Sequence, residues 1–73
     1  MIVTFINNHK LYIQFDTVVK KGLISVTTDS DFEETKKVIN SDFEILKLPE
    51  HILMIKITID IGESKIFRTI KTG

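Results

Sequence analysis

The stretch LMIKITIDI, residues 53–61, alternates strongly apolar side chains with Met, Lys, Thr and Asp. A period of two is typical of a β-strand with one buried face. Gly62-Glu63 follows, and a glycine that opens a two-residue turn supplies the positive φ that a tight hairpin requires. The sequence therefore predicts a hairpin here, with isoleucines and opposite charges matched across the ladder. Its predicted register pairs Asp60 with Lys65, Ile59 with Ile66 and Ile55 with Ile70.

A second hairpin is predicted near the N-terminus, where two apolar segments, residues 2–6 and 11–15, flank the sequence NNHK. Asparagine tolerates the positive φ of tight turns, so Asn8-His9 is the predicted turn. This register gathers the apolar side chains on one side of the sheet, as a half-buried sheet requires. The predicted pairs are Ile6 with Leu11, Thr4 with Ile13 and Ile2 with Phe15.

The segment between the two hairpins has a different pattern. A short strand is predicted over residues 23–27. The sequence SDFE at residues 30–33 then matches a capping box, in which the serine hydroxyl and the glutamate satisfy free N–H groups at the start of a helix. Apolar residues at 32, 38 and 39 share one side of such a helix with Thr35. We therefore predict a helix over residues 31–40 that stops at the sequence NSD.

Residues 43–48 are predicted to form a further strand, which ends at Pro49. SDFE recurs at residues 41–44, so the competing interpretation is a second capping box. In that case the helix continues or restarts through Leu48, because the apolar residues at 32, 39, 43 and 46 also fit helical spacing.

Composition favours strands overall. Isoleucine, valine and threonine make up 26 of the 73 residues, and alanine is absent. Branched β-carbons pack well in sheets, although an A/T-rich genome would produce part of the same bias. We expect one domain over residues 1–73 of the α+β class, with the order β-β-β-α-β-β-β. In this fold a small mixed or antiparallel sheet of five to six strands carries one helix packed on a face, and a parallel crossover around the helix would be right-handed.

Composition also argues against several classes of protein. Ten basic and ten acidic side chains cancel, so no net field points to nucleic acid or membrane. Without cysteine there is neither a disulfide framework nor a thiolate zinc site. The longest apolar run, residues 52–55, is far too short to span a bilayer, and the N-terminal residues lack the basic region of a signal peptide. We expect a cytoplasmic protein with no membrane partner.

No motif for catalysis or metal binding is present. His9 and His51 are the only imidazoles, and both fall in predicted turns. The serines lie in no nucleophile elbow, and the three glycines are too dispersed to cradle a phosphate. We therefore expect a protein that is not an enzyme, with no catalytic residue, no metal site and no cofactor.

Charge is unevenly distributed along the chain. Residues 29–44 carry six acidic and two basic side chains, a net charge of −4. Acidic residues in a first helical turn commonly complement the helix dipole, and that is the ordinary explanation. The functional hypothesis is an acidic helix face that binds a partner protein with a basic surface, together with an arginine on an otherwise apolar strand face. The candidate partner-binding residues are Asp29, Asp31, Glu33, Glu34 and Arg68.

We therefore expect a non-enzymatic protein-interaction module, a small regulator or inhibitor of bacterial or phage type. It would bind its partner through the acidic helix or through an exposed strand edge. The less favoured alternative is a nucleic-acid-binding domain that uses the lysine-bearing C-terminal hairpin. Its candidate residues are Lys56, Lys65, Phe67 and Lys71. Self-assembly, including a homodimer, is the third hypothesis, because so short a chain has a small core.

Overall fold

The computed structural model describes residues 2–71, which form five β-strands and contain no helix. The strands are β1 (Val3–Asn7), β2 (Lys10–Thr28), β3 (Glu33–Lys47), β4 (Met54–Asp60) and β5 (Lys65–Lys71). Every pair of neighbouring strands is antiparallel. The domain is all-β, so the predicted α+β class with a helix packed on a sheet is wrong.

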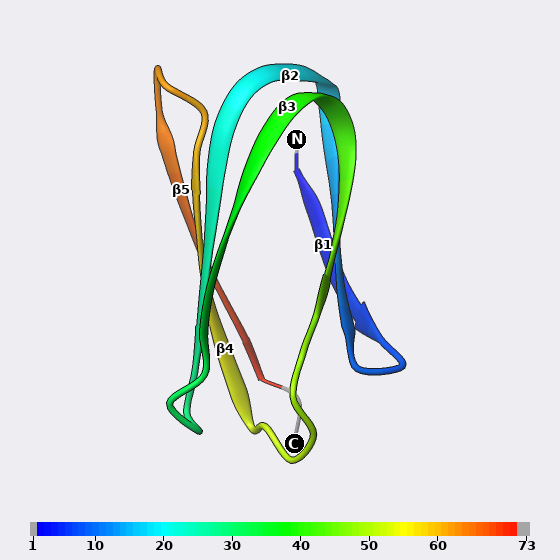
Figure 1. Ribbon diagram of the computed structural model, residues 1–73, viewed down its shortest axis with the longest axis vertical. Helices are drawn as coiled ribbons and strands as arrows, with labels where there is room; N and C mark the ends of the chain where they lie inside the picture. The colour runs from blue at the N-terminus through cyan, green and yellow to red at the C-terminus, as the bar shows by residue number, and fades with distance from the viewer. Residues whose placement is uncertain (1, 72–73) are drawn as a thin grey trace.

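The sheet curls into a half-barrel because its two longest strands, β2 and β3, bend together into an arch (Figure 1). The first arm of the arch consists of β1, residues 10–14 of β2 and residues 43–47 of β3. The second arm consists of residues 33–37 of β3, residues 23–28 of β2, β4 and β5. Between the arms lies the bend, residues 15–22 of β2 and 38–42 of β3. There the register shifts, and β2 takes a longer path than β3.

The core lies between the two arms. Strand alternation directs one set of side chains inward from each arm, and those of this set that are buried are all isoleucine, leucine, valine or phenylalanine. The buried set is Ile2, Leu11, Ile13, Phe15, Ile24, Val26, Val38, Leu46, Leu48, Ile55, Ile57 and Ile59. Many of the β-branched residues that are abundant in the composition therefore form the hydrophobic core inside the curled sheet.

Both hairpins have the predicted turns. Asn8 and His9 have φ of 51° and 60°, and Gly62 has φ of 90°. These positive values match the residue types that tight hairpin turns prefer. The confirmed pairs are Ile6 with Leu11, Thr4 with Ile13, Asp60 with Lys65, Ile59 with Ile66 and Ile55 with Ile70. The predicted strand over residues 23–27 is also confirmed, as a part of β2.

The predicted helix over residues 31–40 is wrong, because most of this segment belongs to β3. β3 pairs with β2 on one side only, and an edge strand of this kind commonly carries charge. Its inward positions bear Glu34, Lys36 and Glu44 as well as the buried Val38 and Leu46. These charged side chains interrupt the alternation of apolar and polar residues by which a strand is recognised in a sequence. Pairing with β2 supplies the backbone hydrogen bonds that a helix would otherwise have made.

The first SDFE sequence forms a turn. The N–H of Thr28 donates to the carbonyl of Phe32 over 3.0 Å, and Asp31 has φ of 62°. The hydroxyls of Thr28 and Ser30 lie 3.0 Å apart. The serine therefore stabilises the connection between β2 and β3, where the sequence had indicated a helix cap.

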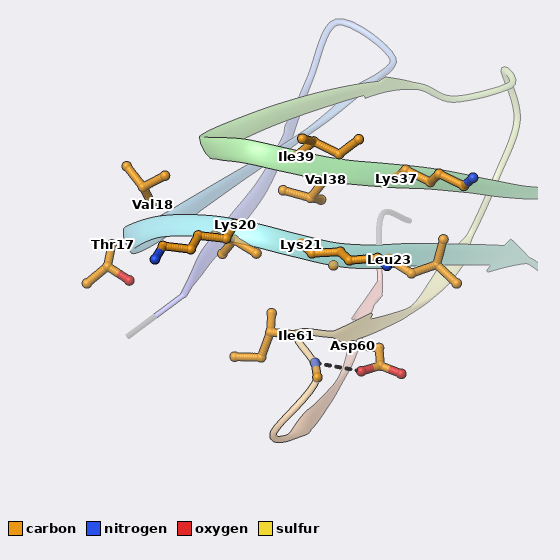
Figure 2. Close-up of a pocket in the computed structure, with 13 residues that line it drawn as sticks. Thr17, Val18, Lys20, Lys21, Leu23, Lys37, Val38, Ile39, Asp60 and Ile61 are labelled. Carbon is orange, nitrogen blue, oxygen red and sulfur yellow. Dashed lines mark hydrogen bonds between the residues drawn. The ribbon is translucent and has the colours of Figure 1, made fainter.

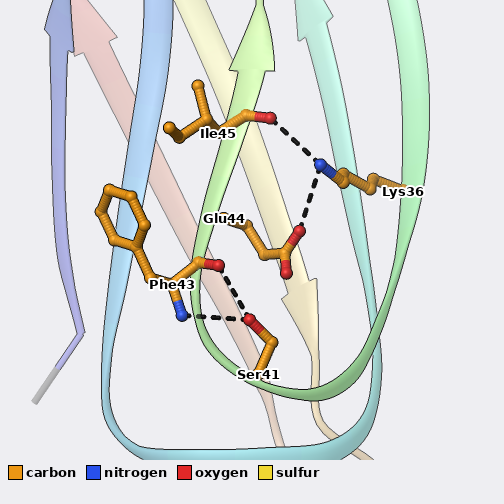
Figure 3. Close-up of polar contacts among 5 residues, drawn as sticks. All are labelled: Lys36, Ser41, Phe43, Glu44 and Ile45. Carbon is orange, nitrogen blue, oxygen red and sulfur yellow. Dashed lines mark hydrogen bonds and ion pairs between the residues drawn. The ribbon is translucent and has the colours of Figure 1, made fainter.

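The second SDFE sequence lies at the bend of β3, where Asn40 has φ of 49°. The Ser41 hydroxyl donates to the carbonyl of Phe43 over 2.8 Å and accepts from the N–H of Phe43 over 3.2 Å (Figure 3). The strand predicted over residues 43–48 is confirmed up to Lys47. A helix through Leu48 and a parallel crossover are both wrong.

An ion pair joins the two halves of β3 across the bend. The ammonium of Lys36, in the second arm, lies 3.1 Å from a carboxylate oxygen of Glu44 in the first arm. It also donates to the carbonyl of Ile45 over 3.2 Å (Figure 3). A partly exposed pair contributes at most about 1 kcal/mol, so its main effect is to hold the curvature and to occupy a carbonyl of β3.

Candidate interaction surfaces

The acidic residues predicted to bind a partner do not form one face. Asp29 and Asp31 lie in the turn between β2 and β3. Glu33 and Glu34 begin β3 opposite Thr27 and Val26, and neighbouring strand positions point to opposite sides of a sheet. The acidic helix that motivated this site is absent from the described chain, so the site is not retained.

Asp29 has a structural role. One of its carboxylate oxygens accepts hydrogen bonds from the backbone N–H groups of Leu53 at 3.1 Å and Met54 at 3.3 Å. These contacts, with that from Leu53 the largest, lower the pKa of the Asp29 carboxyl from its ordinary value. Asp29 therefore ties the β2–β3 turn to the start of β4.

We expect Asp29→Asn to flatten the acid-induced loss of stability. A carboxyl whose pKa is lowered by folding stabilises the protein above its unfolded pKa of about 3.9, and this stabilisation is lost as the pH falls through the lower folded value. Melting temperatures between about pH 6 and pH 2 would measure the slope. Asp31→Asn is the matched control, because the Asp31 carboxylate accepts no hydrogen bond from the described residues. An unchanged slope in Asp29→Asn would contradict this role.

The predicted nucleic-acid residues do come together. Lys56, Lys65, Phe67 and Lys71 occupy alternate positions on the outer face of β4 and β5, and Phe67 is 72% exposed. Arg68 belongs to the opposite face, where it lies half-buried across from Ile57. Of the acidic residues with which Arg68 was grouped, Glu34 lies on this same face by register, with β2 and β4 between the two strands.

A groove that the sequence did not indicate lies at the bend. On one side of β2, pairing with β1 ends at Gln14 and pairing with β4 ends at Leu23. Within the described chain, residues 17–22 thus have no strand partner on this side, whereas Val19, Lys21 and Gly22 pair with β3 on the other. The open side borders a hollow of about 850 Å³ (Figure 2). We call it the bend groove; it is lined by residues 17–23, 37–39 and 60–62.

The bend groove combines an apolar lining with a basic rim. Val18 is 58% exposed, Ile39 65% and Leu23 40%. The charged lining residues are three exposed lysines, Lys20, Lys21 and Lys37, and one acid, Asp60. A carboxylate oxygen of Asp60 accepts the N–H of Gly62 over 2.9 Å (Figure 2). The groove is therefore suited to an apolar segment that also carries negative charge.

The first arm presents an exposed aromatic surface. On its outer side, the Phe5 and Tyr12 rings stack with centroids 4.8 Å apart and planes inclined by 8°. Tyr12 and Phe43 follow at 6.1 Å and 32°. The register adds Val3 and Ile45 to the same side. These five residues are the first-arm face.

Sequence reasoning missed both surfaces for identifiable reasons. Residues 17–21, TVVKK, lie between the strands predicted over residues 11–15 and 23–27, and their apolar pair beside two lysines is a usable signal. The first-arm face needs Phe43, which becomes a neighbour of Tyr12 only when β3 pairs with β2.

Among residues 2–71, no three histidine or acidic side chains lie close enough together to hold a metal ion. The same residues include no helix that could span a membrane. A scan against models of protein families finds no match to this sequence, and a search of curated proteins finds no significant similarity.

Proposed function

We propose that this protein is a non-enzymatic interaction module that captures an extended segment of a partner protein in the bend groove. One observation carries the proposal: the groove coincides with the part of β2, residues 17–22, that has no strand partner on that side within the described chain. An extended peptide can add to such an edge through main-chain hydrogen bonds, while alternate side chains enter neighbouring pockets.

The lining determines the chemistry of the partner segment. Exposed Val18, Leu23 and Ile39 favour apolar side chains, and Lys20, Lys21 and Lys37 favour carboxylates. Alternating apolar and acidic residues would place each type where the groove accepts it, because side chains in a strand alternate. The segment is therefore acidic, whereas the partner expected from the sequence had a basic surface.

In this proposal the protein acts in the cytoplasm as a small regulator or inhibitor of bacterial or phage type. Occupying a segment of another protein is sufficient for such a role and needs no catalytic residue. Because strand addition uses backbone groups, the partner's sequence has to match only the alternation and the charge.

The test is a titration of isotopically labelled protein with an acetylated octapeptide of alternating valine and glutamate, followed by NMR. We expect the amide signals of residues 17–23 and 37–39 to shift. Combining Lys21→Glu with Lys37→Glu should weaken binding by at least about tenfold, since each reversal replaces an attraction by a repulsion. Lys56→Glu with Lys71→Glu is the matched control, which reverses two lysines on the outer face of β4 and β5.

A peptide methylated on alternate backbone nitrogens separates strand addition from simple charge attraction. It keeps its side chains but loses main-chain donors, so we expect it to bind much more weakly. Equal binding of the methylated peptide would contradict strand addition. Equal weakening by the control pair, or shifts confined to β4 and β5, would contradict the groove.

Nucleic-acid binding remains a second candidate, because the register gathers Lys56, Lys65, Phe67 and Lys71 on one face. A single exposed ring among lysines allows one base to stack. This function would be supported if a labelled single-stranded oligonucleotide bound the wild-type protein at low salt but did not bind the Phe67→Ala variant. No binding at low salt would exclude it.

A further inference from the structure

We infer that the free edge of β3 is where a second copy of this chain docks, so that the sheet continues through a two-fold symmetric dimer. The dimer does not depend on the bend groove, which borders the open side of β2, away from this edge. The inference rests on the unpaired side of β3 and on the sequence EETKK, residues 33–37, whose charges are complementary to themselves.

One side of β3 has no strand partner. Among residues 2–71, β3 pairs with β2 alone, so its other side presents unpaired N–H and C=O groups. The ladder with β2 runs without a shift from residue 33 to residue 39, and the side chains of residues 33–37 are all exposed. This part of β3 is therefore a regular, uncovered edge to which another strand can add.

The charges on this edge are largely unmatched within the described chain. Their cross-strand partners on β2 are all uncharged: Glu33, Glu34, Lys36 and Lys37 lie opposite Thr27, Val26, Ile24 and Leu23. Glu33, Glu34 and Lys37 make no ion pair among residues 2–71, and Lys36 is paired only with Glu44. A strand on the other side of β3 can supply the opposite charges that β2 lacks.

A second copy of β3 supplies them. When an antiparallel copy is related by a two-fold axis through Thr35, Glu33 of each copy lies across from Lys37 of the other. Glu34 likewise lies across from Lys36, so opposite charges meet in every charged pair. Thr35 meets its own copy at the axis, and threonine pairs are also favourable across strands. Residues directly across a ladder point to the same side of the sheet, so the members of each pair can touch.

The same charges exclude the neighbouring registers. Centring the axis on residue 34 would oppose two copies of Glu34, and centring it on residue 36 would oppose two copies of Lys36. Axes through residues 33 and 37 bring together two glutamates and two lysines in the same way. Like charges directly across a ladder are destabilising. Charges commonly protect an edge strand from pairing, but here they permit one symmetric register and disfavour the others.

The ion pair that Lys36 already makes is compatible with the dimer. Its ammonium has three donors, and two of them are used by Glu44 at 3.1 Å and by the carbonyl of Ile45 at 3.2 Å (Figure 3). The Lys36 side chain is 43% exposed. One donor is thus left for Glu34 of the second copy.

The pairing is short, so the dimer is weak. Five residues of about 3.4 Å each give a ladder of about 17 Å, which covers less than the roughly 800 Å² that each partner buries in a stable complex. We expect a dimer Kd between about 10 µM and about 1 mM. Salt screens exposed ion pairs, so raising NaCl from about 20 mM to about 500 mM should weaken the dimer several-fold.

The experiment is sedimentation equilibrium of the full chain at low salt over that concentration range. We expect the wild type to dimerise. Glu33→Lys with Glu34→Lys makes the edge entirely basic, and Lys36→Glu with Lys37→Glu makes it entirely acidic, so each double variant should be monomeric. An equimolar mixture of the two should form a heterodimer, because every charged pair is then opposite.

The matched control is Glu50→Lys with Glu63→Lys. It changes the net charge as much as Glu33→Lys with Glu34→Lys does, but at exposed positions outside the strands. The control should dimerise like the wild type. Circular dichroism checks that each variant is folded.

A charge exchange that leaves Lys36 and its ion pair in place does not depend on the folding of the double variants. Glu33→Lys alone and Lys37→Glu alone should each raise the dimer Kd by about tenfold. Combining them in one chain restores opposite charges at both symmetric contacts, so dimerisation should recover. Failure to recover would contradict the register.

A cross-link tests the position of the axis. The chain has no cysteine, and residues directly across an antiparallel ladder have α-carbons about 4.5–5.5 Å apart, a distance that a disulfide can span. With oxidised glutathione as the oxidant, Thr35→Cys should therefore form a disulfide-linked dimer. Thr69→Cys, at an exposed position on β5, is the matched control and should link much more slowly.

Three results would overturn the dimer. They are a wild type that is monomeric at about 1 mM and low salt, folded double variants that dimerise alone or fail to associate when mixed, and Thr35→Cys that links no faster than Thr69→Cys. Binding of the acidic octapeptide by a monomeric wild type would remove the dimer and leave the function proposed for the bend groove in place.

Discussion

Ile24→Ala should lower the free energy of unfolding by about 2–5 kcal/mol, the range for truncating a buried isoleucine. Ile24 has no exposed surface and lies in the middle of the second arm, where β2 is flanked by both β3 and β4. β2 and β4 are each held here by ladders on both sides, so they cannot easily collapse into the cavity. A chain of this length has a total stability of about 4–11 kcal/mol, so a large part would be lost.

Urea unfolding followed by circular dichroism would measure the effect, and fluorescence of Tyr12, the single tyrosine, provides a second probe. Val18→Ala is the matched control, since it also truncates a β-branched residue of β2 but at a position that is 58% exposed. The control should change stability by no more than about 0.5 kcal/mol. Similar losses in both variants would mean that the packing between the arms is not the main source of stability.

The parts of this fold that the sequence predicts are those set by neighbouring residues. Asn8-His9 and Gly62 specify their turns through positive φ, and each turn fixes the register of the strands on either side. Alternation over residues 53–61 then determines which side chains are buried. Both hairpins follow from interactions within about twenty residues of chain, and both are confirmed.

The helix prediction fails because the secondary structure of residues 31–40 is determined by a strand outside this segment. Residues 33–39 contain three β-branched residues but also four charged ones, so local preferences are balanced. The structure of this segment is decided by β2, which pairs with β3 along one side over most of its length. A capping box indicates only that a serine can satisfy backbone groups; in the turn it is instead the Thr28 hydroxyl that accepts the N–H of Ser30, and the two hydroxyls lie 3.0 Å apart.

The candidate surfaces depend even more on tertiary structure. The bend groove exists because β1 and β4 pair with different parts of β2 and leave residues 17–22 between them. The alternation of apolar and polar residues does not indicate where strand pairing stops. Neither the unpaired side of residues 17–22 nor the neighbours of Ile39 can therefore be derived from it. The grouping of Lys56, Lys65, Phe67 and Lys71 was accessible because it lies within one hairpin.

Gly22→Val should destabilise the protein even though valine is the better strand residue. Preference for strands alone would favour valine by up to about 1 kcal/mol. However, a β-carbon on Gly22 would lie 2.9 Å from the carbonyl oxygen of Asp60 and 3.2 Å from a methyl carbon of Val19. The first contact is with backbone at the end of β4, which cannot move without disturbing the pair formed by Leu23 and Asp60. We expect a net loss of about 1–3 kcal/mol, typical of overpacking.

A comparison with Gly62→Ala separates two reasons for requiring a glycine: lack of space for a β-carbon and a positive φ. No atom lies within 4 Å of a β-carbon built on Gly62, but its φ of 90° is unfavourable for any other residue. Gly62→Ala should therefore lower stability by about 1–2 kcal/mol through the turn alone, with the pairing of β2 and β4 unchanged. Gly22→Val should in addition accelerate amide hydrogen exchange where Leu23 pairs with Asp60, because β4 has to move away from β2. Two results would contradict this explanation: slow exchange at that pair in Gly22→Val, or a variant as stable as the wild type. Either would mean that the close contact between β2 and β4 does not require a glycine at position 22.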